Sequence, residues 1–276
     1  MTSPTIHEHI KTDKQIVLRL GADTMSFAVV GDTASRLDNY EQMNSKSGIS
    51  MSANLREFLK NRQIPSQDYS RAYVLIDTPT MLIPSEEFQA ETATVQYDHT
   101  FTGLERSLKM SYAMPSLHAV AVYAVDKDLK SVLSDHFPDF RIMPVCLPLW
   151  KHLHQRSYGQ TRHRLYGYLH GGHLDVFRFS QNRFKFCNSF NANQVQDALY
   201  YLLYVFRQLG MDANRDEIYA IGDIPRKKWL TDHLKEYVKN VVPADAGDLG
   251  IDESQRWRQI PLDLLAMINN ELMTGN

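Results

Sequence analysis

Apolar and polar positions in the first half of the chain follow an order typical of an α/β protein. Three apolar-rich runs within residues 15–43, separated by turns at Gly21 and Gly31, predict three strands. Apolar residues at helical spacing predict a helix near 52–62, and RAYVLID (71–77) is typical of a buried strand. The first half therefore begins with three strands, a helix and a further strand.

The second half repeats this order. Three strands are predicted within 165–190, a helix within 193–209 and a buried strand in EIYAIGD (217–223). Gly21 and Gly171, which are 150 positions apart, each lie inside a strand-turn-strand. We interpret the pattern as an internal duplication of one α/β unit.

A second likeness links the strand AVAVYAV (119–125) and its following helix to EIYAIGD and the helix after it. An acidic residue, Asp126 or Asp223, stands directly before each predicted helix, where an N-cap carboxylate is expected. We therefore expect residues 119–125 to begin the strand-helix-strand-helix stretch that closes the first unit.

These patterns also predict the domain organisation. Residues 1–14 are polar and aperiodic, and we expect a disordered tail there. The first unit spans 15–156 and includes a less regular, proline-bearing segment at 78–116. The polar and basic stretch 157–164 is expected to link it to the second unit, 165–276.

Composition narrows the class of protein further. Hydrophobic residues make up 43% of the 276 positions, which is enough for a sizeable core. Thirty basic residues oppose 32 acidic ones, and this near neutrality disfavours a nucleic-acid partner. Two cysteines, together with the lack of a long apolar run, predict a cytoplasmic protein without membrane insertion.

The order of three antiparallel strands, a helix and parallel strand-helix units, given twice, resembles the actin-like ATPase superfold of two ribonuclease-H-like lobes. The first half is most similar to the bacterial branch that contains the pilus-assembly protein PilM and the cell-division protein FtsA. In that branch a small subdomain interrupts the first lobe, so the resemblance implies an inserted subdomain at the less regular segment 78–116. The chain also resembles a bacterial family catalogued as a domain of unknown function. The resemblance covers about residues 15–272 and rests on pattern and order.

The resemblance implies a nucleotide cleft built around turn glycines. In this superfold each lobe supplies a strand-turn-strand whose glycine lets backbone N–H groups approach the phosphates closely. A third glycine motif follows the strand beside the adenosine. The positions that match are Gly21, Gly171, Gly172 and Gly222, which are therefore candidate nucleotide-binding residues.

The acidic residues that accompany these glycines in the superfold are missing from this chain. The resemblance implies an Asp two residues before each turn glycine, where it helps to hold magnesium, but Arg19 and Leu169 occupy these positions. Asp23 and Asp175 are available after a register shift, although a hairpin turn for Asp23 and an outward-facing strand position for Asp175 are preferred. We therefore predict a vestigial cleft with no catalytic residue, metal or cofactor, and keep ATP with magnesium as the alternative.

The sequence offers less support for a metal site or for a separate catalytic acid than for the nucleotide cleft. The histidines at 152, 154, 163, 170 and 173 lack the spacing of a zinc site, so ordinary surface or turn positions are expected. Asp77 ends a buried strand at the edge where α/β active sites gather.

Basic and aromatic residues raise two further possibilities. The segments PRKKW (225–229) and 151–164 offer local positive charge for nucleic acid, or else a solvated helical turn and a linker. Tyr200, Tyr201 and Tyr204 lie off the apolar stripe of their helix, which suits either a partner surface or a contact between lobes.

The sequence therefore predicts a non-catalytic actin-like protein that acts as a cytoplasmic scaffold for an unidentified protein partner. An ATP-binding or ATP-hydrolysing protein of actin-like or sugar-kinase type is the alternative, and a nucleic-acid-associated module is the second alternative. The fold alone does not decide between them.

Overall fold

The computed structural model describes six stretches of the chain, which are residues 14–31, 37–64, 69–159, 161–181, 183–251 and 260–270. The tail predicted at 1–14 lies outside them except for Lys14. Within these stretches, none of the helices combines the length and the apolar character that a membrane crossing requires.

The first sheet is built from two segments of the first half. It has five strands in the order β3-β2-β1-β4-β8. β1, β2 and β3 are antiparallel, whereas β4 and β8 run parallel to β1. The strands span β1 (Gln15–Leu20), β2 (Thr24–Val30), β3 (Leu37–Asn44), β4 (Arg71–Ile76) and β8 (Phe140–Pro144).

The second sheet has the same order of strands, β11-β10-β9-β12-β13. Again three antiparallel strands come first and two parallel strands follow. These strands span β9 (Arg164–His170), β10 (His173–Ser180), β11 (Arg183–Asn191), β12 (Glu217–Gly222) and β13 (Asn240–Pro243). The strand-strand-strand-helix-strand order predicted for each half is therefore present in the structure.

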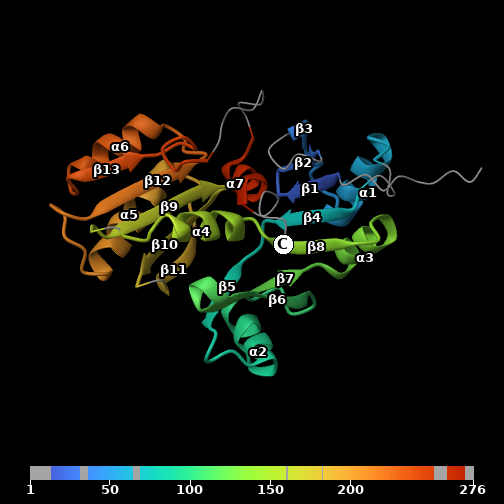
Figure 1. Ribbon diagram of the computed structural model, residues 1–276, viewed down its shortest axis with the longest axis horizontal. Coiled ribbons are helices and arrows are strands. Elements are labelled where there is room, and N and C mark those ends of the chain that lie inside the picture. The colour runs from blue at the N-terminus through green and yellow to red at the C-terminus, as the bar shows by residue number, and fades with distance from the viewer. Residues whose placement is uncertain are drawn as a thin grey trace, which may run out of the picture.

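Helices cover the outer face of each sheet (Figure 1). α1 (Met51–Asn61) and α3 (Lys127–His136) bury their apolar stripes on the first sheet, and α5 (Val195–Gln208) and α6 (Lys227–Lys235) on the second. α1 and α3 both begin with a side-chain cap: the Ser50 hydroxyl accepts a hydrogen bond from the backbone N–H of Ala53, and the Asp126 carboxylate accepts one from that of Leu129. The capping role predicted for Asp126 is confirmed.

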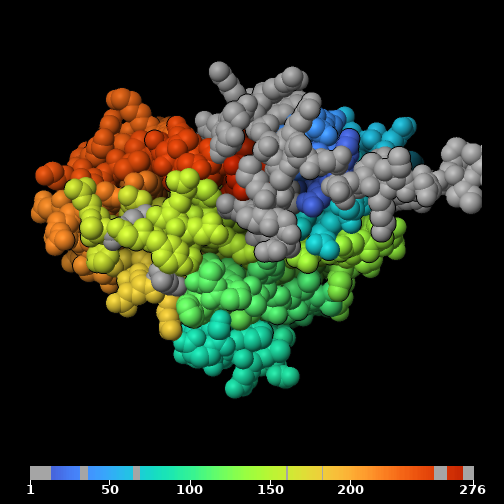
Figure 2. Space-filling model, viewed as in Figure 1, coloured from blue at the N-terminus to red at the C-terminus, as the bar shows by residue number. Residues whose placement is uncertain are grey.

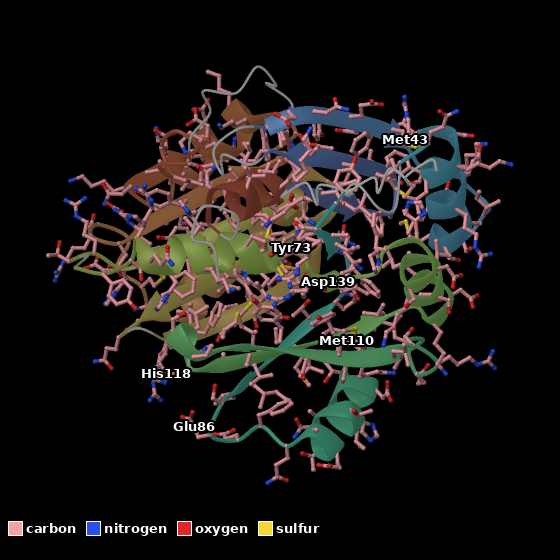
Figure 3. All side chains as sticks on the ribbon, turned by 45° about the vertical axis from the view of Figure 1, so that its right-hand side comes forward. Met43, Tyr73, Glu86, Met110, His118 and Asp139 are labelled. Carbon is pink, nitrogen blue, oxygen red and sulfur yellow. The ribbon has the colours of Figure 1, made fainter. Side chains whose placement is uncertain are left out.

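Two helices, α4 (Cys146–Gln155) and α7 (Leu262–Asn270), lie between the sheets (Figure 1). Their apolar residues join one cluster, the inner cluster, with strand residues of both sheets. Side chains on β4 alternate accordingly: Tyr73 belongs to the inner cluster, whereas Val74 belongs to the cluster beneath α1 and α3. Met43, near the end of β3, packs against that second cluster, away from Tyr73 (Figure 3). Because both faces of these strands are covered, their sequences are almost continuously apolar.

A third, smaller sheet lies at the lower edge of the molecule (Figure 1), and the space-filling view shows this part of the chain, in green and teal, projecting from the rest (Figure 2). Its order is β5-β7-β6, with β5 (Thr80–Pro84), β6 (Leu108–Met114) and β7 (Ala119–Val125). The short helix η1 (Pro115–Leu117) joins β6 to β7. α2 (Ala90–Thr100) packs on this sheet through Ala93 and Tyr97.

The role expected for residues 119–125 is wrong. β7 pairs antiparallel with β5 and β6 and is not a strand of the first sheet. By sheet order, the counterpart of β12 is β4, not β7. A strand covered on both faces gives the same apolar run in any sheet, so the likeness of 119–125 to 217–223 lies in composition alone.

Gly167 on β9 marks a close approach of α5 to the second sheet. A Cβ added there would lie 2.5 Å from Leu202 Cδ2. We expect Gly167→Ala to lower the free energy of unfolding by about 1–3 kcal/mol, because a well-packed core has no room for an extra methyl group. Adding Leu202→Val should recover part of this loss, as measured by urea unfolding.

Gly247→Ala is the matched control. A Cβ at Gly247 would lie 3.5 Å from Asp245 Oδ1, an ordinary contact, so the change should be below about 0.5 kcal/mol. Equal losses for the two glycine variants would contradict the packing described here.

Candidate functional site

A cavity of about 1040 Å³ opens between the two five-stranded sheets. The first sheet contributes the β1–β2 turn and Asp77, which follows β4. The second contributes the end of β9, the β12–α6 loop and the residues after β13, and the start of α7 completes the lining. This cleft lies at the carboxyl ends of the parallel strands, where α/β folds place their sites.

Three of the four predicted glycines line this cleft. They are Gly21, Gly171 and Gly222, whereas Gly172 is not part of the lining. Gly171 and Gly172 form the two-residue β9–β10 turn, and both have positive φ, +50° and +77°, as a tight hairpin turn of type I′ requires. Their presence is therefore explained by the backbone before any ligand is considered.

Gly222 is also required by its own surroundings. Its φ is +92°, and an added Cβ would lie 2.2 Å from the carbonyl oxygen of Leu169. Gly21 is less constrained, since its Cβ would lie 3.2 Å from Thr24 O. The glycines give the cleft the close backbone approach of a phosphate site, but they do not supply its charge.

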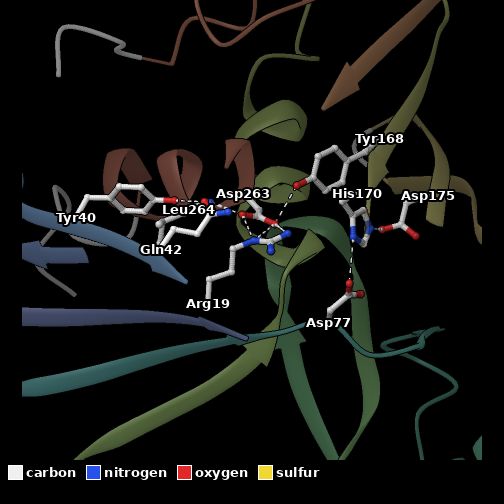
Figure 4. Close-up of polar contacts among 9 residues, drawn as sticks. All are labelled: Arg19, Tyr40, Gln42, Asp77, Tyr168, His170, Asp175, Asp263 and Leu264. Carbon is white, nitrogen blue, oxygen red and sulfur yellow. Dashed lines mark hydrogen bonds and ion pairs between the residues drawn. The ribbon is translucent and has the colours of Figure 1, made fainter. Parts of the chain in front are cut away.

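Arg19 lies at the base of the cleft and is bound to a carboxylate far away in the sequence. Its Nε donates to Asp263 Oδ1 at 2.8 Å and to Oδ2 at 2.9 Å, and its Nη2 lies 2.8 Å from Oδ2 (Figure 4). Asp263 is fully buried at the start of α7, and Arg19 is only 7% exposed. Burial alone would lower the pKa of Arg19, but the charge of Asp263 raises it, so the guanidinium stays charged.

Tyr168 brings the second sheet to the same carboxylate. Its hydroxyl donates to Asp263 Oδ2 at 2.9 Å, while the backbone N–H of Leu264 donates to Oδ1 (Figure 4). Burial, and then the charge of Asp263, raise the pKa of Tyr168 well above its usual range, so the hydroxyl keeps its proton. Both oxygens of Asp263 are thus satisfied within the protein.

His170 lies between two carboxylates. Its Nε2 donates to Asp175 Oδ2 at 3.0 Å, and its Nδ1 lies 3.6 Å from Asp77 Oδ2 (Figure 4). The outward-facing position predicted for Asp175 is wrong, because the residue is only 7% exposed. It lies on the same face of β10 as Phe177, and that face is covered by the inner cluster. Period-two alternation gives the face of a strand but not whether that face is covered.

The charge of His170 follows from these neighbours. Burial alone would lower its pKa, but Asp175 and then Asp77 raise it to about 10. For the carboxyl group of Asp77 the two effects have the opposite signs: burial alone would raise its pKa, but the neighbouring His170 lowers it below its usual value. The imidazole is therefore an imidazolium at neutral pH, and two cations face three carboxylates at the base of the cleft.

The mouth of the cleft carries exposed charges. Asp23, Asp223 and Asp245 line it together with Lys227, and all four are exposed. The capping role predicted for Asp223 is wrong, since α6 begins later, at Lys227, after Arg226 in a left-handed conformation. Asp23 lies in the β1–β2 turn, as expected from the sequence.

The histidines do not converge on a metal site. In the part of the chain that the structure describes, no group of three or more His, Cys, Asp or Glu side chains is placed to hold a metal ion. His152 and His154 point in different directions, as predicted, but they are buried and not on the surface. His152 Nε2 donates to Leu249 O at 2.9 Å, and His154 packs against Tyr158 and Phe179.

Magnesium, which the resemblance to actin-like ATPases implies together with ATP, does not fit the residues at the base of the cleft. It prefers carboxylate oxygens and water. The position two residues before Gly21 presents the guanidinium of Arg19, the matching position before Gly171 presents Leu169, and the oxygens of Asp263 already accept hydrogen bonds.

The basic segments are partly neutralised by neighbours. Arg162 and Arg164 both form ion pairs with Glu217, at 3.2 and 2.8 Å, and Lys228 pairs with Asp232 at 3.2 Å. Tyr200 and Tyr204 are 60% and 47% exposed, so the contact between lobes that was considered for them is wrong. Tyr201 is half-buried and stacks on Phe190.

No local pattern in the sequence indicates the role of Asp263 or of His170. Asp263 stands in the apolar segment PLDLLAM, and a carboxylate at a buried helical position is the one local signal of a buried partner. Its partner, Arg19, lies 244 positions away, and no local pattern links the two.

Comparisons with known proteins agree on family and fold. A family model described as "Protein of unknown function (DUF3822)" matches residues 3–241. A Bacteroides thetaiotaomicron protein of actin-like ATPase fold and unknown function has a TM-score of 0.80 and 24% identity, over 87% of this chain and 95% of that one. PilM, solved as the PilM–PilN type IV pilus biogenesis complex, has a TM-score of 0.56 and 10% identity, over 94% and 98%. No curated protein matches the chain.

These similarities establish the actin-like ATPase fold, so the resemblance stated from the sequence is confirmed. The identities are low, and the likeness therefore concerns architecture. The chemistry of the cleft has to be judged from its own residues.

The pair formed by Arg19 and Asp263 predicts a large effect of a small substitution. We expect Asp263→Asn to lower the free energy of unfolding by about 3–5 kcal/mol, because it leaves the buried Arg19 cation without a counter-charge. Asp139→Asn is the matched control, since Asp139 pairs with Arg71 at the surface. This change should lower the free energy of unfolding by less than about 1 kcal/mol. Urea unfolding measures both, and similar small losses would contradict a buried pair.

The raised pKa of His170 predicts a pH dependence. The folded-state pKa of about 10 exceeds the ordinary 6.5, so the stabilisation is complete below pH 6.5 and is lost as the pH rises through 10. The ring faces Asp77, Asp175, Tyr168 and His173.

We expect the wild type to be more stable than His170→Asn at pH 6.5, with the difference shrinking toward pH 10. Urea unfolding of both proteins at several pH values measures this difference, because titration of the remaining groups largely cancels. A difference that stays constant with pH would show that His170 is not charged in the folded protein.

Proposed function

Because the chain belongs to the DUF3822 family and has the actin-like ATPase fold, we propose that it is a non-catalytic member of that fold which acts as a scaffold through contacts with other proteins. One observation carries the proposal. Where a magnesium-binding carboxylate is needed, Arg19 is committed to a buried pair with Asp263. Phosphoryl transfer depends on positioned metal and charge neutralisation, and this arrangement supplies neither.

The proposal includes two tandem lobes that arose by duplication. The identical strand orders of the first and second sheets support it, as does the position of a turn glycine between the first two strands of each. In this proposal the first lobe spans 15–156, a linker spans 157–164 and the second lobe spans 165–276. The three-stranded sheet is then an insertion in the first lobe that extends to Val125.

A protein partner is supported by two features. Tyr200 and Tyr204 stack at 5.9 Å on the exposed side of α5, and tyrosine is enriched at protein interfaces. The PilM neighbour was solved in complex with PilN, which is an example of this fold in a protein assembly. We propose a PilM-like role on this basis, and we place it in the cytoplasm because two cysteines and the lack of a long apolar run favour that compartment.

The alternative is nucleotide binding, with or without hydrolysis. The volume of the cleft, about 1040 Å³, and its lining by Gly21, Gly171 and Gly222 favour it. The exposed carboxylates at the mouth, Asp23, Asp223 and Asp245, are the groups that a metal-bound nucleotide would meet.

A thermal-shift titration with Mg-ATP separates the two candidates. A nucleotide at 100 times its dissociation constant would add about 2.7 kcal/mol to the free energy of unfolding. We expect no shift and no release of phosphate from ATP, because Arg19 and Leu169 offer magnesium no oxygen ligand. A shift or hydrolysis that is abolished by Ala22→Trp, a change at an exposed residue lining the cleft, would overturn the proposal.

The partner surface has its own test. We expect Tyr200→Ser combined with Tyr204→Ser to reduce the recovery of proteins that co-purify with the wild type from its native cell, and to leave the free energy of unfolding within about 0.5 kcal/mol. Mass spectrometry of pull-downs made with and without ATP measures the recovery. Tyr237→Ser, also at an exposed tyrosine, is the control, and equal recovery with all three proteins would contradict this surface.

A further inference from the structure

The charged groups at the base of the cleft come from both sides of it. Asp77 follows β4 of the first sheet, Asp175 lies on β10 of the second, and Asp263 lies on α7 between them. Two cations separate these carboxylates, Arg19 from the first sheet and His170 from the second. The side chains of all five are at most 14% exposed.

Two links cross from one sheet to the other. In the first, Arg19 binds Asp263, and Asp263 also accepts from Tyr168 on β9 of the second sheet. In the second, His170 of the second sheet lies 3.6 Å from Asp77 of the first, and it is held there by its hydrogen bond to Asp175. Figure 4 shows both links side by side at the base of the cleft.

Opening the cleft would break these links at high cost. If the sheets rotate apart, Asp77 loses its counter-ion, and Asp263 must leave either Arg19 or Tyr168. A buried charge without its partner is strongly unfavourable. The inner cluster also holds the sheets together, but burial of apolar surface is non-directional, whereas these ion pairs fix one arrangement.

We propose that these residues form a clasp that holds the two sheets in one closed arrangement without a bound nucleotide or metal ion. The clasp comprises Arg19, Asp77, Tyr168, His170, Asp175 and Asp263. Clefts between lobes ordinarily close when a ligand supplies the bridging contacts. Here the guanidinium and the imidazolium supply them from within the chain. The inference rests on the proposed function, because a cycle of nucleotide binding and release would need the cleft to open.

Distance measurements across the cleft test the clasp directly. Asn44, at the end of β3 in the first sheet, and Lys235, at the end of α6 on the second, are exposed and do not line the cleft, so spin labels at Asn44→Cys and Lys235→Cys report the separation of the two sheets without removing a cleft residue. Cys146→Ala and Cys187→Ala remove the native thiols. Double electron–electron resonance should give one narrow distance distribution, unchanged by millimolar Mg-ATP.

Variants of the clasp should open the cleft. We expect Arg19→Met and Asp77→Asn, each in the labelled protein, to broaden the distribution toward longer distances. Arg178→Met is the matched control, because Arg178 is a strand arginine that is also 7% exposed but does not line the cleft. The control should keep the distribution of the parent protein.

Two results would overturn the clasp. One is a wild-type distance that shortens on addition of Mg-ATP, and the other is a clasp variant that keeps the narrow parent distribution. If Arg19→Met does not fold, Asp77→Asn and the Mg-ATP titration of the parent still decide. ATP binding without any change in distance would contradict the proposed function but leave the clasp standing, so the two failures are distinguishable.

Discussion

The buried ion pair between Arg19 and Asp263 is the interaction on which the arrangement of the cleft depends. It joins β1, at the beginning of the first sheet, to α7, near the end of the chain. Tyr168 adds the second sheet through the same carboxylate. A buried carboxylate needs a counter-charge and partners for both oxygens, and here the guanidinium, a hydroxyl and one backbone N–H provide them. Three parts of the fold therefore meet at one charge.

The fold provides the shape of the cleft, and the side chains decide its chemistry. Two sheets of the same strand order face each other across α4 and α7, and their turns bring Gly21 and Gly171 to a common cavity. An actin-like ATPase would place metal-binding carboxylates beside these turns. In this member of the DUF3822 family the base of the cleft contains internal cations instead, Arg19 and His170, each bound to protein carboxylates.

Local patterns in the sequence predicted the order of three strands, a helix and a strand at the start of each half, and the turn glycines. The resemblance to actin-like proteins then marked Arg19 and Leu169 as the positions where the motif acids are replaced. Local patterns did not predict that Asp175 is buried, because alternation along a strand cannot show what covers each face. Nor did they predict the pairing of β7, since a strand covered on both faces has no periodicity that reveals its neighbours. Asp263 was missed because its partner is 244 positions distant.

Nuclear magnetic resonance of the Arg19 side chain tests the central claim most directly. In protein labelled with nitrogen-15 at arginine and assigned by comparison with Arg19→Met, the Nε–H group of Arg19 donates to both oxygens of Asp263 and is shielded from solvent. The account predicts a resolved Nε–H signal that exchanges slowly with water and does not move when Mg-ATP is added. A signal that exchanges as fast as those of surface arginines, or that shifts with Mg-ATP because Asp263 is released to the metal, would contradict it.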